Sequence, residues 1–283
     1  MNTYKGIDVS RHQGTINWTK VKAAGIKFAF LKATEGVNYT DPNFSANAQG
    51  ATAAGIPIGV YHFLRAGSAA DQARDCLAAI KPYKLTWPVA VDVENPPKGT
   101  ELSDLGRDKL TDLALDFCSR IKAAGYQPMI YASYNWLYGA KLIDTARIKA
   151  ANIPVWMAWY SNATPDNTDR SALCDIWQYA SDGKVDGITS SGLDVNVSYK
   201  DFGAKPYTCD TSGTVQIALG SCYTAKTTGD ITLVPGTAGV VQIVRCIQQG
   251  YTLWHIVPLG KSGQDVGIYP EGKPEKLFTV KIK

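Results

Sequence analysis

A short pattern recurs four times along the chain and constrains the fold more than any other feature. Each copy has a helix end of small residues, then a glycine or asparagine, then an apolar run rich in β-branched or aromatic residues. The copies are VKAAGIKFAFLKATEG (21–36), ATAAGIPIGVYHF (51–63), IKAAGYQPMIYAS (121–133) and IKAANIPVWMAWYS (148–161). The residues after the small run are Gly25, Gly55, Gly125 and Asn152. This position favours a left-handed helix end, and the run that follows is typical of a buried strand.

The spacing of the copies predicts alternating strands and helices. Gly25 and Gly55 are 30 residues apart, and the 70 residues from Gly55 to Gly125 leave room for one more unit. That unit is a helical stretch at about 69–80 followed by a strand at 88–94. Alternation of this kind predicts a parallel sheet. Further strands are expected at 6–10, 174–179 and 193–197.

About eight strands in about 200 residues predict an α/β fold, a closed barrel of the triosephosphate isomerase type. The last three strands leave too little sequence between them for full helices. We therefore expect five βα units followed by three bare strands.

Acidic residues stand at several of the predicted strand ends. An apolar run ends in Asp92 and Glu94, which are two residues apart and therefore share a face of an extended chain. Asp8 and Asp194 stand at two other strands. Because active sites in such barrels lie at the carboxyl ends of the strands, the four carboxyls are expected to converge.

Two neighbouring carboxylates suit glycosidic cleavage. Their repulsion raises one pKa and leaves the other group ionised, so a proton donor and a negative charge coexist. Glu94 has the longer side chain and is the candidate general acid. Taken alone, Asp92 and Glu94 also fit a surface turn, and the additional carboxyls favour the site.

Aromatic and polar residues accompany the acids. Flat aromatic side chains suit the C–H faces of sugar rings, although core packing is the alternative for each of them. The candidates are Tyr61, Phe63, Tyr131, Trp156, Trp159 and Tyr160. Lys32 and Glu35 fit either a structural ion pair or contacts to a substrate. His62 is expected to be a hydrogen-bonded wall residue and not a metal ligand.

Composition excludes several classes of function. The net charge of +4 is dispersed, without a cluster of Lys and Arg, which argues against a nucleic-acid partner. The six cysteines form no C-x-x-C pair and the three histidines are scattered, so neither a metal nor a cofactor is expected. Free thiols are expected, with a disulfide among Cys209, Cys222 and Cys246 only in an oxidising compartment.

Targeting signals are also not evident in the sequence. The first residues have no apolar segment typical of a signal peptide, and no apolar run of 18 residues suits a membrane span. We expect synthesis in a cytoplasm and no embedding in the membrane. If the protein works outside, a separate partner must release it.

The pattern changes near residue 203. The segment 204–213 lacks periodicity and is predicted to be a linker. From 214 to 283, about six short strand-like runs alternate with turn-like segments such as KTTGD and PEGKPEK. These runs predict a small all-β domain, either a Src-homology-3-like barrel or a sandwich. A binding module and a stabilising or dimerising appendage both fit, with Tyr251, Trp254, His255 and Tyr269 as candidate contacts.

Eight motifs occur in a fixed order along residues 4–202. They are GIDVSRHQGTINW, FAFLKATEG, GVYHF, PVAVDVE, IYAS, VWMAWY, IWQY and GLDVNV. Together they resemble glycoside hydrolase family 25, the Chalaropsis-type lysozymes of bacterial and phage cell-wall lysins. The resemblance implies that residues 1–203 form a (β/α)5(β)3 muramidase barrel. Such a barrel cuts the β-1,4 bond between N-acetylmuramic acid and N-acetylglucosamine in peptidoglycan.

The resemblance also assigns roles to individual residues. It implies that Glu94 is the proton donor, that Asp92 is the second essential carboxylate, and that Asp8 and Asp194 are site aspartates. Tyr131 and the group Trp156, Trp159 and Tyr160 match the family's pocket aromatics more loosely. The expected biological setting is a phage or prophage endolysin, released through a holin-like protein, with a wall-binding C-terminal domain that raises the local substrate concentration.

Two stereochemical outcomes stay open. Carboxyl groups about 5–5.5 Å apart predict retention and groups about 6.5–9.5 Å apart predict inversion, but backbone spacing does not fix this separation. The 2-acetamido group of muramic acid could itself attack the anomeric carbon with Asp92 orienting it, and we favour this retaining route. A non-catalytic peptidoglycan-binding barrel and a chitinase-like hydrolase are the alternative functions.

Overall fold

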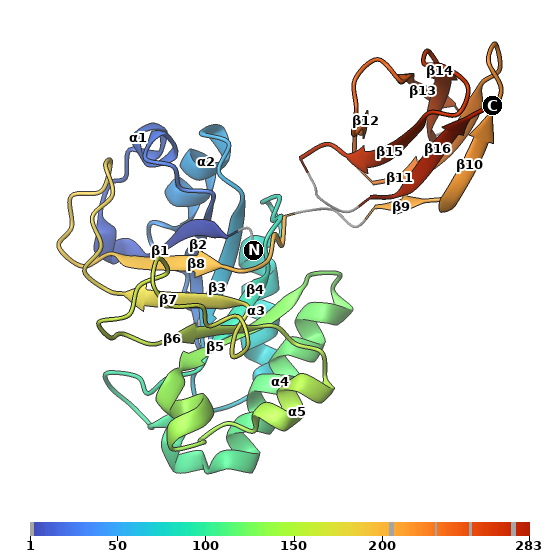
Figure 1. Ribbon diagram of the computed structural model, residues 1–283. Coiled ribbons are helices and arrows are strands. Elements are labelled where there is room, and N and C mark those ends of the chain that lie inside the picture. The colour runs from blue at the N-terminus through green and yellow to red at the C-terminus, as the bar shows by residue number, and fades with distance from the viewer. Residues whose placement is uncertain (1–2, 204–206, 230, 249–250, 273–275) are drawn as a thin grey trace. The chain divides into compact units, whose positions relative to one another are not determined.

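The computed structural model describes residues 3–203, 207–229, 231–248, 251–272 and 276–283. The chain divides after Gly203 into an N-terminal unit and a C-terminal unit (Figure 1). Among the helices in the described part of the chain, none is long and apolar enough to cross a membrane.

The N-terminal unit is a closed barrel of eight strands in sequence order, which confirms the predicted α/β barrel. Strands β1 to β7 run parallel to one another. The last strand, β8, closes the barrel and is antiparallel to both β7 and β1. The strands are β1 (Tyr4–Val9), β2 (Phe28–Glu35), β3 (Ile58–Phe63), β4 (Val89–Asp92), β5 (Pro128–Ser133), β6 (Val155–Ala158), β7 (Ile176–Ala180) and β8 (Asp194–Ser198).

Five α-helices follow the first five strands, as predicted, and no α-helix follows β6, β7 or β8 within the described stretch 155–203. The α-helices are α1 (Trp18–Ala23), α2 (Phe44–Ala53), α3 (Ala69–Ile80), α4 (Arg107–Ala123) and α5 (Thr145–Ala150). Single helical turns are η1 (Arg11–Gln13), η2 (Leu102–Leu105) and η3 (Asn135–Gly139). The φ angles of Gly25, Gly55, Gly125 and Asn152 are 87°, 69°, 88° and 53°. These values confirm the left-handed helix ends.

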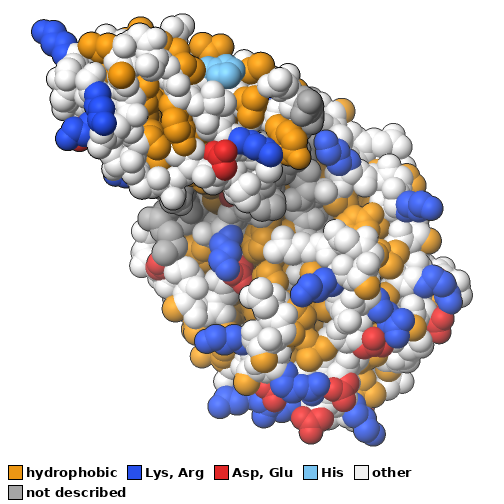
Figure 2. All heavy atoms as spheres, turned by 90° about the vertical axis from the view of Figure 1, so that its right-hand side faces the viewer, with side chains coloured by type: hydrophobic (Ala, Val, Ile, Leu, Met, Phe, Trp, Pro, Cys, Tyr) orange, Lys and Arg blue, Asp and Glu red, His pale blue; other side chains and the backbone are white. Residues whose placement is uncertain are grey.

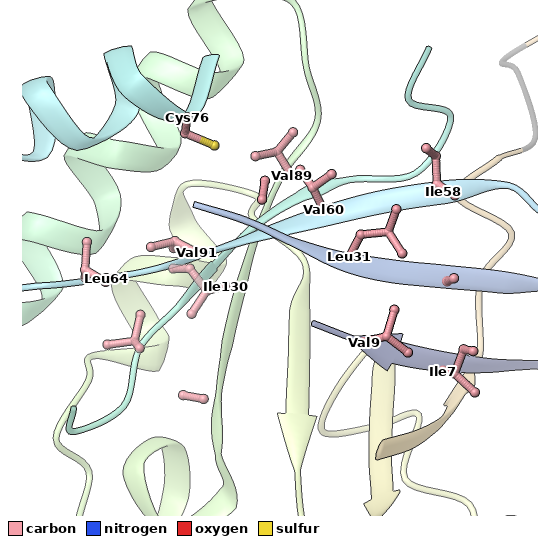
Figure 3. Packing of buried hydrophobic residues seen from close by; sticks show 14 of the residues in the cluster. Ile7, Val9, Leu31, Ile58, Val60, Leu64, Cys76, Val89, Val91 and Ile130 are labelled. Carbon is pink, nitrogen blue, oxygen red and sulfur yellow. The ribbon is translucent and has the colours of Figure 1, made fainter. Parts of the chain in front are cut away.

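An apolar layer lies between the strands and the helices. Ile7, Leu31, Val60 and Val91 point into it from successive strands, and Cys76 joins them from α3 (Figure 3). All five side chains are fully buried. Alternate residues of each strand face this layer, so the intervening residues face the barrel interior.

Large rings fill the interior. Phe30 stacks on Trp156 with 4.5 Å between ring centroids. A Cβ atom on Gly6 would lie 2.2 Å from the ring of Phe28, and one on Gly59 would lie 2.6 Å from Phe30. The strands therefore carry glycine where these rings need space, and aromatic side chains fill this part of the barrel interior.

The C-terminal unit has two four-stranded sheets, in the orders β10-β16-β15-β12 and β13-β14-β11-β9. Both contribute to one core, which includes Trp254, Val266 and Phe278. The strands are β9 (Thr208–Cys209), β10 (Gly213–Ile217), β11 (Tyr223–Thr228), β12 (Leu233–Pro235), β13 (Val241–Gln248), β14 (Tyr251–Pro258), β15 (Asp265–Pro270) and β16 (Phe278–Ile282).

Two of these strands differ from the prediction. The short strand β9 lies inside 204–213, which was expected to be a linker, and pairs with β11. β11 includes part of KTTGD, which was expected to be a turn. Its sequence, YTAKTT, is mostly polar and shows no apolar alternation strong enough to indicate a strand.

Candidate active site

A cleft of about 580 Å³ lies at the carboxyl ends of the parallel barrel strands. Every strand of the barrel contributes at least one residue to it. Ten of the twelve predicted site residues line the cleft: Asp8, Lys32, Glu35, Tyr61, Phe63, Asp92, Glu94, Tyr131, Trp156 and Asp194. The convergence of acids that the sequence predicted is therefore present.

Asp92 and Glu94 lie at the end of β4 with the buried Val93 between them. Asp92 is the last residue of the strand, whereas Glu94 lies in the bend that follows. Both side chains still line the cleft. Asp92 is 6% exposed, and its Oδ1 atom finds no hydrogen-bond partner within the described residues, while Glu94 is exposed.

The cleft raises the pKa of both groups. Burial raises the pKa of Asp92 well above its usual value, and the charge of Glu94 adds to the shift. Although Glu94 has exposed surface, the surrounding wall desolvates its carboxyl and raises its pKa, with a further contribution from Asp194. Lys32 opposes both shifts. Glu94 thus holds its proton to a higher pH than an ordinary glutamic acid and remains reachable from solvent.

Asp8 and Asp194 face each other across β1 and β8. Asp194 begins its strand, contrary to the predicted strand end, and it reaches the cleft because β8 runs antiparallel to β1. Burial raises the pKa of Asp8 well above its usual value, and Asp194 raises it further. Burial also raises the pKa of Asp194, to about 6.

Two amides that the sequence reading missed hold Asp8. Gln178 and Asn196 donate to the same carboxylate oxygen, Oδ2, at 2.9 and 2.8 Å. Both amides are buried. A signal existed for each residue: Gln178 interrupts the apolar strand IWQYA, and Asn196 is two residues after Asp194 and therefore on the same face.

A cationic cluster lies beside the acids. Lys32 Nζ is 2.6 Å from Glu35 Oε2, which confirms the ion-pair interpretation, although both residues also line the cleft. Arg65, another residue that was not predicted, pairs with Glu35 and donates to the carbonyl oxygen of Lys98 at 2.5 Å. Burial alone would raise the pKa of Glu35, but Lys32 and Arg65 together lower it.

The predicted aromatics separate into two groups. Tyr61, Phe63, Tyr131 and Trp156 line the cleft, with Tyr131 and Trp156 in an edge contact at 4.7 Å. Trp159 and Tyr160 are not among its lining residues.

Trp159 is instead part of a partly buried stack beside the apolar core. Its ring lies 3.7 Å from that of Tyr134, and the Arg170 guanidinium covers it at 3.4 Å. Trp159 does not line the cleft, because alternation along the chain turns its side chain away from that of Trp156, and its predicted contact with a substrate stays a prediction. Tyr160 is half exposed and reaches the site indirectly, through a hydrogen bond from its hydroxyl to Gln178.

Neither His62 nor any cysteine is among the residues that line the cleft. His62 is buried, hydrogen-bonds Thr34 and Gln72, and stacks on Phe117, and burial lowers its pKa to about 4. No group of three His, Cys, Asp or Glu side chains in the described part of the chain is arranged to hold a metal ion. All six cysteines are free thiols.

An eight-stranded α/β barrel whose mouth gathers carboxyls and aromatic rings is typical of carbohydrate-cleaving enzymes. Comparison with known families gives a narrower result. The model of the glycosyl hydrolases family 25 matches residues 7–188, and the chain belongs to this family.

Named relatives agree with this assignment. Lysozyme M1 of Streptomyces globisporus is 35% identical over 191 residues, which cover 65% of this chain and 64% of the relative. The autolytic lysozyme of Clostridium acetobutylicum is 32% identical and covers 66% of this chain and 53% of the relative. An N,O-diacetylmuramidase of Chalaropsis sp. is 32% identical, and the match covers 47% of this chain and 68% of the relative. The chain thus spans less than two thirds of the length of the first two relatives.

Solved structures are similar as well. The lysozyme of Streptomyces coelicolor matches with a TM-score of 0.58 and 33% identity, over 71% of this chain and 94% of that protein. The autolysin LytC of Streptococcus pneumoniae matches with a TM-score of 0.56 and 27% identity, over 70% of this chain and 47% of that protein. It was solved in complex with a synthetic peptidoglycan ligand.

Proposed function

We propose that the chain is a muramidase that cleaves the β-1,4 bond between N-acetylmuramic acid and N-acetylglucosamine in bacterial peptidoglycan. One observation carries the proposal. A single cleft combines Glu94, an exposed carboxyl with a raised pKa, with Asp92, a buried carboxyl that has an unpartnered oxygen. Family membership and the names of the relatives support it.

Glu94 acts as the general acid. Its proton passes to the glycosidic oxygen as the bond to the anomeric carbon breaks, and the N-acetylglucosamine side leaves as an alcohol. A raised pKa suits this step, because the group must still be protonated when the substrate arrives. In the second step the ionised Glu94 takes a proton from the attacking water.

Asp92 orients the 2-acetamido group of the muramic acid. The free Oδ1 atom accepts the acetamido N–H, while the acetamido carbonyl oxygen attacks the anomeric carbon and forms a cyclic oxazolinium ion. Water then opens this ion from the opposite face. Two inversions give net retention, so the β-anomer is the first product.

The remaining lining residues position the sugar and stabilise charge. Asp8 and Asp194 supply negative potential near the anomeric carbon, where positive charge develops. Tyr61, Phe63, Tyr131 and Trp156 offer apolar planes to sugar C–H faces, with Lys32 and Glu35 as polar contacts at the edge.

Three measurements separate this proposal from the alternatives. Clearing of a suspension of purified cell walls distinguishes a hydrolase from a non-catalytic wall-binding barrel. Mass spectrometry of the products should find muramic acid at the new reducing end, whereas chitin fragments would favour a chitinase-like enzyme. A proton NMR time course should detect the β-anomer first. Early appearance of the α-anomer contradicts the retaining route and favours inversion.

We infer a wall-binding role for the C-terminal unit. Large apolar side chains remain exposed on it, including Val244, Ile247 and Tyr251, and Figure 2 shows hydrophobic side chains at the surface of this unit. The Lys226 ammonium lies 3.2 Å from the centre of the Tyr251 ring. Trp254, a candidate contact by sequence, is 2% exposed and donates to Thr227, so it belongs to the core.

A wall pull-down tests this role. Tyr251→Ala in the full chain should lower the fraction of protein that sediments with purified walls, while activity on short soluble fragments stays unchanged. Equal sedimentation of variant and wild type would argue for a stabilising appendage. The expected release through a separate holin-like protein stays a prediction.

A further inference from the structure

Gln178 connects three groups in and beside the active site. The residue lies on β7, is 2% exposed and lines the cleft. Its Oε1 atom accepts hydrogen bonds from the hydroxyls of Tyr131, at 2.9 Å, and Tyr160, at 2.5 Å. Its Nε2 atom donates to Asp8 Oδ2 at 2.9 Å. One amide therefore joins strand β7 to β1, to β5 and to the segment after β6.

The chemistry of these groups sets the direction of the three hydrogen bonds that Gln178 makes. An amide has one accepting oxygen and one donating nitrogen, and a phenol has a single O–H. Because Tyr131 and Tyr160 both give their protons to Oε1, neither proton points into the cleft. The opposite amide orientation would place Oε1 against the oxygens of Asp8.

A second amide supports the same arrangement. Trp156 Nε1 donates to Asn196 Oδ1 at 2.8 Å, so the Asn196 nitrogen must face Asp8. Asp8 Oδ2 thus receives two N–H donors and is held as an acceptor. The wall from the Tyr131 hydroxyl to Asp8 Oδ2 therefore offers lone pairs to a ligand.

We propose that Gln178 is a positioning residue of this enzyme, which holds Tyr131 and Asp8 as acceptors for the N–H and O–H groups of the bound sugar. This inference rests on the proposed muramidase function. It explains why a neutral amide occupies the centre of an acidic cleft. An apolar residue of the same size would release the phenol protons and leave Asp8 with one donor fewer.

Two substitutions separate the two halves of the network. Gln178→Met removes both the acceptor for the phenols and the donor to Asp8. Gln178→Glu keeps the acceptor, but it can donate to Asp8 only when the introduced carboxyl is protonated.

Titratable or charged groups around this position are Asp8 on β1, Lys32 on β2, Tyr61 on β3, Asp92 and Glu94 at the end of β4, Tyr131 on β5, Tyr160 after β6 and Asp194 on β8. Because four of them are carboxylic acids and Lys32 is the one cation among them, the introduced carboxyl should hold its proton in mildly acidic solution.

The experiment measures kcat and KM of wild type and both variants on peptide-free oligomers of the alternating glycan, between about pH 4.5 and 8. At pH 7 we expect both variants to lose about 10²-fold in kcat, the cost of misplacing a positioned group. Near pH 5 the Gln178→Glu variant should recover at least about tenfold relative to Gln178→Met. A merely structural role would give two parallel pH profiles.

Thr111→Val is the matched control. Thr111 is also fully buried and hydrogen-bonded, to the Arg107 carbonyl oxygen and the Asp144 amide, but on α4 and outside the cleft. It should lower Tm without changing kcat or the pH profile. Parallel profiles of the two Gln178 variants, or a kcat of Gln178→Met within threefold of wild type, overturn the inference. No hydrolysis by wild type in the same assay would overturn the proposed function itself.

Discussion

The β4 side of the cleft and the β1–β8 side each carry two carboxyl groups, but they hold them differently. Asp92 has a buried oxygen without a hydrogen-bond partner in the part of the chain that the structure describes, and Glu94 reaches into solvent. Asp8, in contrast, receives two amide donors. Buried polar groups are almost always satisfied, so an unsatisfied one marks a place where a ligand completes the hydrogen bonding. The comparison supports the proposal that the β4 side reacts and that the β1–β8 side is a fixed electrostatic wall.

The largest effect should come from Glu94→Gln, which removes the proton donor without changing its shape. General acid catalysis typically contributes about 10²–10⁴-fold, so clearing of walls should fall by at least this amount. Turbidity and product release measure the loss, and sedimentation with walls checks that binding is retained. Activity close to wild type would contradict the role of Glu94 as general acid and the assignment of the β4 side as the reactive side.

Asp92→Asn should be the next largest. We expect kcat to fall by about 10²–10³-fold, because the amide cannot supply the negative charge that the acetamido group needs. Because burial raises the pKa of Asp92, its ionised form destabilises the folded state, and a neutral amide in its place should raise Tm at pH 7. Kinetics and thermal unfolding of one preparation test both expectations. A lower Tm would mean that Asp92 stabilises the fold.

Asp194→Asn tests the electrostatic side through stability. The folded-state pKa of about 6 lies above the ordinary value of 3.8. The folded protein therefore binds this proton more tightly, and the resulting stabilisation is complete below about pH 4 and lost as the pH rises through about 6. The variant lacks this titration. Between pH 4 and 7 its free energy of unfolding should gain about 2–3 kcal/mol relative to wild type, as measured by urea unfolding at each pH. A constant difference across this range would contradict the raised pKa.

Lys32→Met should have the smallest effect and act on the β4 side alone. Lys32 lowers the pKa of both Asp92 and Glu94, so its removal should raise both values. Both limbs of the pH–activity profile should move to higher pH, by about one unit or less. Arg74→Met, in an exposed ion pair of α3, is the control for a lost surface cation. A profile that does not move, or moves to lower pH, would place Lys32 among the structural ion pairs only.

Much of the fold could be predicted because it repeats. The left-handed residues at the ends of α1, α2, α4 and α5 and the apolar strands after them are local features, and helix–strand alternation leaves few topologies open. The strand ends then placed the acids at one mouth. β9 and β11 could not be predicted in this way, because a strand of two residues and a polar strand are recognised only by what they pair with.

The site residues also divide into those that local sequence predicts and those that depend on distant partners. Asp92 and Glu94 share a face by simple alternation, so the sequence by itself determined that pair. Whether Trp159 meets the cleft, that Asp194 arrives at the start of an antiparallel strand, and that Gln178 joins Asp8 to two phenols were decided only by the tertiary structure. Alternation and spacing are properties of neighbouring residues. A hydrogen bond between residues 170 positions apart exists only after the barrel has closed.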